Sequence, residues 1–118
     1  MGYNTANGRY ADTVPVTFSN GVLSATATGA AVEFGDRNSL RLDLVISAAT
    51  GTSPTLDVAV QTSPDGTTWT AVAAFAQQTG AATVRKLFAP LDRFVRVVET
   101  LGGTASPTFT RVISGEAV

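Results

Sequence analysis

The stretch Ser39–Ser47, SLRLDLVIS, alternates apolar and polar side chains along the chain. Four apolar residues share one side of an extended strand: Leu40, Leu42, Leu44 and Ile46. The other side carries polar residues, with Val45 as the exception: Arg41, Asp43 and Ser47. A period of two is typical of a strand with one buried face, whereas a helix repeats every 3.6 residues. The stretch therefore predicts a half-buried β-strand.

The same alternation returns in residues 55–61, TLDVAVQ, with Leu56, Val58 and Val60 at the inward positions. The residues between the two stretches, AATGTSP, are rich in turn formers. We therefore expect residues 39–47 and 55–61 to be adjacent antiparallel strands. Asp43 and Asp57 should then lie on the solvent face beside Arg41, where cross-strand charge pairing contributes little.

Seven further segments have strand-like composition: residues 14–19, 22–28, 31–34, 69–76, 83–89, 93–101 and 108–114. Asn20-Gly21 is a strong hairpin signal, and Pro90 marks a joint because it has no N–H to donate. No segment has a convincing helical period. We therefore expect an all-β protein, an antiparallel and jelly-roll-like β-sandwich of about eight short strands. This single domain should span residues 14–118, after an extended N-terminal arm of residues 1–13.

A weak internal repeat relates residues 35–60 to residues 91–113. Each copy begins with Asp-Arg, continues with a strand and a Gly-Thr and Ser-Pro-Thr segment, and ends with a second strand. The spacing differs between the copies, so the chain is not a solenoid. The simplest interpretation is one hairpin device used twice, and chance convergence of turn residues is the alternative.

The chemistry available to the chain is limited because it contains neither cysteine nor histidine. Disulfides, thiolate metal sites and imidazole bases are therefore excluded. The acids are scattered without a catalytic or metal-binding motif, and phosphate-binding loops are absent. We expect a protein that is not an enzyme, with no catalytic residues, no cofactor and no bound metal.

The charge content points to protein partners. Only 14% of the residues are charged and the net charge is −1, which gives little attraction to nucleic acid. No apolar run reaches the roughly 20 residues of a membrane span, and the first residues do not form a signal peptide. A polar but weakly charged surface fits a protein that packs against others, although a biased composition would look the same.

The stretch Gln61–Trp69, QTSPDGTTW, predicts a tight turn between two strands. Pro64 suits the first central position of a type I turn, and Asp65 and Gly66 tolerate the conformations that follow. Trp69 would then pack on the turn or in the core. The alternatives are a calcium site at Asp65 and a sugar-binding surface with Tyr3, Tyr10 and Trp69 as aromatic candidates.

Basic residues concentrate late in the chain. Residues 84–111 have a net charge of +3, whereas residues 1–83 have a net charge of −3. Four basic residues are therefore candidates for contact with an acidic partner, although Arg93 and Arg96 should face opposite ways: Arg85, Lys86, Arg93 and Arg96. Ordinary solvated strand faces are the alternative. The arm, MGYNTANGRYADT, could become ordered on a neighbour with Tyr3, Arg9 and Tyr10 as anchors.

Three short motifs carry a family resemblance: SPDG-x-x-W at residues 63–69, LDR-[FY]-[VL]-R at residues 91–96, and the SGEAV end at residues 114–118. With these motifs, residues 30–118 resemble small structural proteins that are encoded among the head and tail genes of tailed bacteriophages, especially phages of actinobacteria. The first 30 residues are not part of the resemblance.

The resemblance implies a non-enzymatic virion component that assembles in the cytoplasm of a bacterial host. The expected role is a capsid decoration or cement protein on the outer head shell. Its partners would be the major capsid protein and copies of itself, with no nucleic acid and no membrane. A tail or baseplate protein is the nearest alternative. A carbohydrate-binding β-sandwich that contacts a host-surface glycan is the alternative from another class.

Overall fold

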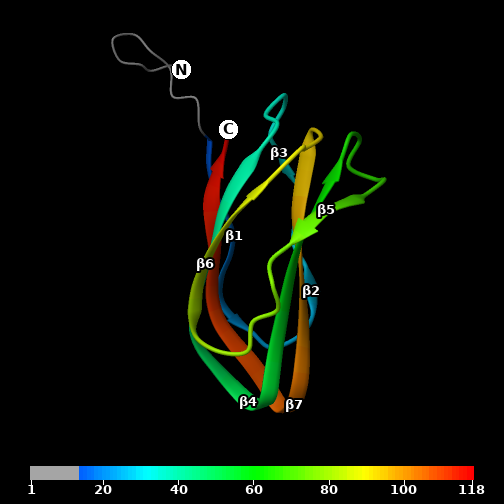
Figure 1. Cartoon of the computed structure of the whole chain (residues 1–118). Coiled ribbons are helices and arrows are strands. Elements are labelled where there is room, and N and C mark those ends of the chain that lie inside the picture. Colours follow the sequence, from blue (N-terminus) through cyan, green and yellow to red (C-terminus); the bar gives the residue numbers. More distant parts are fainter. Residues whose placement is uncertain (1–13) are drawn as a thin grey trace, which may run out of the picture.

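The computed structural model describes residues 14–118, and two long strands form the centre of its sheet. β4 (Leu40–Ser63) and β7 (Phe94–Ala117) each contain 24 residues. The two strands pair antiparallel along almost their whole length, from Leu40 opposite Ala117 to Ser63 opposite Phe94. Figure 1 shows that both strands bend at the same end of the molecule.

Each bend contains a glycine in a conformation that other residues rarely adopt. The φ angle is +100° at Gly51 in β4 and +115° at Gly103 in β7. A Cβ atom at Gly51 would lie 2.7 Å from the Cα atom of Pro107, and one at Gly103 would lie 2.9 Å from the Cα atom of Pro54. The two bends therefore pack directly against each other, and glycine permits both the positive φ and the close approach.

The internal repeat corresponds to these two bends. Thr52 lies opposite Thr104, and Thr50 lies opposite Thr108 with their hydroxyl oxygens 2.5 Å apart. The interpretation as a hairpin used twice is wrong, because each copy is one continuous, bent strand. The expected pairing of residues 39–47 with residues 55–61 is wrong for the same reason. Both segments belong to β4, and each takes its antiparallel partner from β7.

The shorter strands follow the two long ones. β1 (Val14–Leu23), β2 (Ala27–Thr28) and β3 (Val32–Glu33) pair in turn with β7. β5 (Thr70–Ala74) and β6 (Ala82–Phe88) pair with β4. All of these pairings are antiparallel, and the strands of the described residues belong to a single sheet.

The bends divide this sheet into two halves. The first half contains β1, residues 109–117 of β7, residues 40–46 of β4, and β6. The second half contains β2, β3, residues 94–101 of β7, residues 56–63 of β4, and β5. In Figure 1 the first half lies on the left and the second on the right, joined by the bends at the bottom.

The core contains the residues of β4 that the sequence alternation predicts to face inward, from both ends of the strand. Leu40, Leu42 and Leu44 are fully buried, Ile46 is almost so, and Arg41 is exposed, as the alternation predicts. In the other half the fully buried residues include Leu56, Val58, Val60 and Val95. Both sets belong to one hydrophobic cluster, in which the rings of Phe75 and Phe88 pack edge to face with centroids 5.3 Å apart. Burial of these side chains is the main driving force that keeps the halves together.

A buried ion pair joins the two parts of β7 that lie before and after its bend. Glu99 and Arg111 form two hydrogen bonds, each 2.7 Å long, and their side chains are only 5% and 8% exposed. Ser19 donates to Glu99 at 3.0 Å, and Arg111 donates to the Gly21 carbonyl oxygen at 2.9 Å. The pair therefore ties together both halves and β1. The sequence-based charge count treated Glu99 and Arg111 as part of the charge balance, whereas both are interior groups.

The hairpin predicted at Asn20-Gly21 is wrong. β1 continues through these residues, with Asn20 opposite Val112 and Gly21 opposite Arg111. Gly21 does have a positive φ of +112°, but β1 stays paired with β7 on both sides of it. The register of this edge strand against β7 also shifts between Thr17 and Ser19. The dipeptide that favours a turn therefore marks an irregularity within a strand.

The all-β, antiparallel class is confirmed, and the residues that the structure describes contain no helix. They accordingly contain no helix that could span a membrane. They form one sheet of seven strands, so the expected sandwich of about eight short strands is not confirmed. Pro90 lies between β6 and β7, as expected for a joint. The predicted arm of residues 1–13 lies outside the described residues.

Candidate interaction surface

The SPDG segment forms the predicted turn between β4 and β5. The Ser63 hydroxyl accepts a hydrogen bond of 2.9 Å from the Gly66 N–H. One carboxylate oxygen of Asp65 accepts hydrogen bonds from the N–H groups of Thr67 and Thr68, at 2.9 and 3.0 Å. Gly66 has a φ of +81°. Ser63 and Asp65 are therefore occupied in closing the turn, which explains their presence without a ligand.

The pKa of the Asp65 carboxyl lies well below its ordinary value of 3.8, chiefly because the Thr68 and then the Thr67 N–H groups stabilise the carboxylate. Because the folded pKa is lowered, this contribution to stability is fully present above pH 3.8 and is lost as the pH falls through the folded value. We expect Asp65→Ala to lower the free energy of unfolding at neutral pH and to flatten its decline in acid. Urea unfolding at several pH values, with Asp57→Ala as control, measures both effects. An Asp65→Ala curve parallel to that of the wild type would contradict this role.

Trp69, directly after the turn, packs against the beginning of β7. The guanidinium carbon of Arg96 lies 4.3 Å from the centre of the Trp69 ring, which is a close cation–π contact. Arg96 also donates from Nε to the side-chain oxygen of Gln61, its cross-strand neighbour, at 2.7 Å. Trp69 and Arg96 are both half-buried, so part of each side chain remains available to a partner.

A second cation–π contact lies beside the first. The guanidinium carbon of Arg93 is 5.7 Å from the centre of the Phe94 ring, and Arg93 forms an ion pair with Glu33 of β3. A Cβ atom on Gly66 would be 3.9 Å from the Phe94 ring, so the turn sits against this ring. Arg93 precedes β7, so strand alternation does not determine its direction, contrary to the sequence-based assignment of opposite faces to Arg93 and Arg96.

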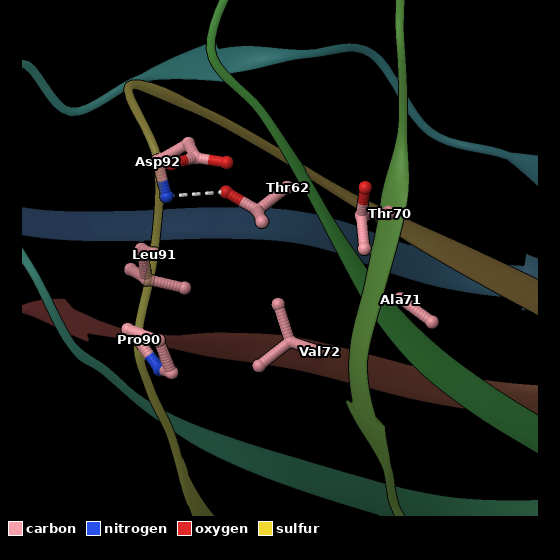
Figure 2. A pocket seen from close by; sticks show the side chains of 7 residues that line it. All are labelled: Thr62, Thr70, Ala71, Val72, Pro90, Leu91 and Asp92. Atoms are coloured by element: carbon pink, nitrogen blue, oxygen red, sulfur yellow. Dashed lines mark hydrogen bonds between the residues drawn. The ribbon is translucent and has the colours of Figure 1, made fainter.

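A small hollow lies next to these contacts, between β5 and the segment before β7 (Figure 2). The Thr62 hydroxyl accepts a hydrogen bond of 2.7 Å from the Asp92 N–H and donates one of 2.9 Å to the Phe94 carbonyl oxygen. Val72 and Leu91 point toward each other across the hollow. Its volume of about 270 Å³ is below the range of small-molecule sites, about 300–1,000 Å³. Asp92 is the one ionisable residue in its lining, so the hollow offers no pair of catalytic groups.

The two longest motifs of the family resemblance thus meet in one place. SPDG-x-x-W supplies the turn and Trp69, and LDR-[FY]-[VL]-R supplies Asp92, Arg93, Phe94 and Arg96. We call the outward part of this contact the two-motif surface and define it by five residues: Gln61, Trp69, Arg93, Phe94 and Arg96. The contact between Trp69 and Arg96 is not visible in the sequence. The presence of both motifs in one chain is the signal that could have indicated it.

The predicted partner-binding residues do not form one patch. Arg93 and Arg96 belong to the two-motif surface, whereas Arg85 and Lys86 lie on β6 in the other half of the sheet. Arg85 is paired with Asp43 at 2.6 Å, and the Lys86 ammonium lies 6.0 Å from the centre of the Phe88 ring. Tyr3, Arg9 and Tyr10 lie outside the described residues. The acidic-partner hypothesis is therefore weakened for Arg85 and Arg93, since a carboxylate already accompanies each.

No protein-family model matches this chain, and no curated protein matches it either. Within residues 14–118, no three potential metal-ligating side chains gather at one site. The arrangement of the two-motif surface is therefore the basis for a functional proposal. A tryptophan and an arginine held against each other, partly exposed, are the side-chain types that most often dominate protein–protein contacts.

Proposed function

We propose that this chain is a non-enzymatic structural protein of a tailed-phage virion, most specifically a decoration protein on the outer surface of the head shell. The observation that carries the proposal is the meeting of the two phage-type motifs at Trp69 and Arg96. The turn-closing roles of Ser63 and Asp65 explain half of the first motif by folding alone. These roles do not explain why Trp69 and Arg96 are left partly exposed on the outer side of the sheet.

The proposed mechanism is attachment of the two-motif surface to the major capsid protein. Trp69 and Phe94 contribute apolar area, and Arg96 contributes hydrogen-bond donors that its contact with Trp69 holds in place. Burial of apolar surface contributes about 25 cal/mol per Å², so a few hundred Å² per copy gives useful affinity after the cost of association. Repetition by the symmetry of the shell multiplies the effect, because each copy would brace neighbouring capsid subunits against outward pressure.

We infer further that the fold is a jelly roll, an architecture shared by many capsid and lectin domains. Divided at its bends, the chain contains eight segments, with β2 and β3 counted as one. They pair first with eighth, second with seventh, third with sixth, and fourth with fifth. This is the pairing of one long antiparallel hairpin wrapped around a core. The continuous β4 and β7 carry the chain from one layer to the other.

The alternatives predict different partners for the same surface. A tail or baseplate protein would use it on tail subunits. A carbohydrate-binding module would need an open aromatic face, and Arg96 already occupies one side of Trp69. That contact favours a protein partner over a sugar.

The proposal predicts that Trp69→Ala and Arg96→Ala each weaken binding to DNA-filled heads prepared without this chain. We expect a loss of about thirtyfold or more for the stronger variant, since central interface residues of these types contribute about 2 kcal/mol or more. Co-sedimentation of purified protein with such heads measures the affinity, and circular dichroism verifies the fold.

Lys86→Ala is the matched control, because Lys86 is an exposed basic residue on the other half of the sheet and lies outside the two-motif surface. Wild-type binding by both Trp69→Ala and Arg96→Ala would contradict the proposal. Sedimentation with isolated tails instead of heads would support the tail alternative. Glycan binding that disappears in Trp69→Ala would support the sugar alternative.

A further inference from the structure

The large hydrophobic side chains that are exposed in residues 14–118 all belong to one half of the sheet. Val22 is 64% exposed and Leu87 is 59% exposed, and three further residues complete the set: Val14, Val45 and Val118. Each lies in, or directly after, a strand of the first half. Val45 lies near the middle of this half, opposite Val112 of β7 and Thr83 of β6. Val14 lies opposite the buried Ala117 and therefore belongs to the inner side of this half, whereas Val22, Val45 and Leu87 alternate with inward residues and point outward. We call the outward side of the first half the valine face.

The charged groups on the valine face are balanced and already paired. Arg41 and Glu116 form an ion pair at 3.1 Å, and Arg85 and Asp43 form one at 2.6 Å. The four side chains surround a hollow of about 300 Å³ above Gly115. The face therefore carries two positive and two negative charges, with opposite signs two residues apart along β4. It has no net charge to attract a strongly acidic or basic partner.

We propose that the valine face binds the same face of a second copy of this chain. A copy presents what this face can accept: exposed valine and leucine side chains, and an arginine and a carboxylate close together. Each arginine can meet a carboxylate of the other copy while keeping its own, and such pairing suits a self-complementary interface. A lipid surface would instead strip water from four charges without offering apolar partners for them.

The area of the valine face is sufficient for a weak, specific contact. Four strands about 4.8 Å apart, with about eight residues each at 3.3 Å per residue, cover about 500 Å². Two copies would then bury about 1,000 Å², the lower limit for a specific interface. Such a contact would be reversible in solution and stronger on a shell that holds the copies side by side.

The inference deepens the proposed function, because it names the surface through which decoration copies would meet, but its test needs no virion. Sedimentation velocity of the purified wild-type chain should show a sedimentation coefficient that rises with concentration. Val45→Glu and Leu87→Glu should each raise the dissociation constant at least about tenfold, since a buried, unpaired charge is costly at a packed interface. Thr28→Glu, which adds the same charge to the exposed β2 in the other half, should self-associate as the wild type does.

Two results would overturn the inference. One is a wild-type chain that stays monomeric up to about 1 mM, beyond the range of a specific contact of this size. The other is self-association that survives both glutamate variants with the fold intact by circular dichroism. In that second case, loss of head binding in Val45→Glu would assign the face to the shell instead. Loss of self-association with head binding retained would support the inference and leave the two-motif surface as the attachment site.

Discussion

Replacement of Arg111 by alanine should lower the free energy of unfolding by about 3–5 kcal/mol, because it leaves the Glu99 carboxylate buried without its partner. Only 5% of the Glu99 side chain is exposed, so the carboxylate is largely shielded from bulk water when it loses these two hydrogen bonds. The remaining donor is the Ser19 hydroxyl, which cannot neutralise the charge. Small domains have about 5–15 kcal/mol of stability in total, so the variant should be close to unfolding at room temperature.

Urea unfolding of Arg111→Ala against the wild type measures this loss. Arg41→Ala is the matched control, since it breaks the exposed pair with Glu116 and should cost no more than about 1 kcal/mol. The double variant Glu99→Leu with Arg111→Met should recover about 2 kcal/mol or more, because neither charge then remains buried alone. Equal stabilities for Arg111→Ala and Arg41→Ala would show that the interior pair does not join the two halves.

Alanine at Gly51 or Gly103 should destabilise the protein by about 2–4 kcal/mol, from an unfavourable positive φ and from overpacking of the bend. At Gly51 the new methyl group would lie 2.7 Å from the Pro107 Cα atom and 3.0 Å from the Thr104 carbonyl oxygen. At Gly103 it would lie 2.9 Å from the Ser53 carbonyl oxygen. In each case the obstacle is the backbone of the other long strand, which cannot move without disturbing the bend.

Thermal and urea unfolding of the two variants measure the effect, with Gly80→Ala as the control. A Cβ atom at Gly80 would have no neighbouring atom within 4 Å, and the φ angle of Gly80 is not positive. Alanine there should therefore change stability by less than about 1 kcal/mol. Because both substitutions would push the same two bends apart, their double variant should lose less than the sum of the single losses. Fully additive losses, or losses no larger than that of Gly80→Ala, would contradict the mutual packing of the bends.

The strand class could be predicted from the sequence because local alternation reports burial directly. Leu40, Leu42 and Leu44 are inward, as their period of two requires, and the same holds for Leu56 and Val58. The path between these residues could not be predicted in the same way. Gly-Thr-Ser-Pro suits a chain reversal and a bend equally well, and the choice depends on β7, which is distant in sequence but pairs with both ends of β4.

Asn20-Gly21 illustrates the same limit. The dipeptide favours a hairpin in isolation, but the hydrogen bonds of β1 with residues 109–117 of β7 keep the chain extended. Arg111 adds a hydrogen bond to the Gly21 carbonyl oxygen. The long-range pairing overrides the local preference, and no local pattern announces it. The interior position of Arg111 was missed for a similar reason, since a lone arginine in a strand is usually solvated.

The candidate surface was predicted only in part. The sequence indicates Arg93 and Arg96 by their charge, whereas the structure shows that each lies over an aromatic ring. The sequence predicts turn packing or a sugar contact for Trp69, and its partner 27 positions later cannot be inferred from spacing. Arg85 and Lys86 are near Arg93 and Arg96 in sequence, but they lie on β6 in the first half of the sheet, whereas Arg96 lies in the second half.

A cryo-electron microscopy reconstruction of virions of the phage that encodes this chain would test the proposed function most directly. The proposal predicts density for the folded sheet on the outside of the head shell, with Trp69 and Arg96 in contact with the major capsid protein. A particle without this chain, or one in which the two-motif surface faces solvent, would contradict it.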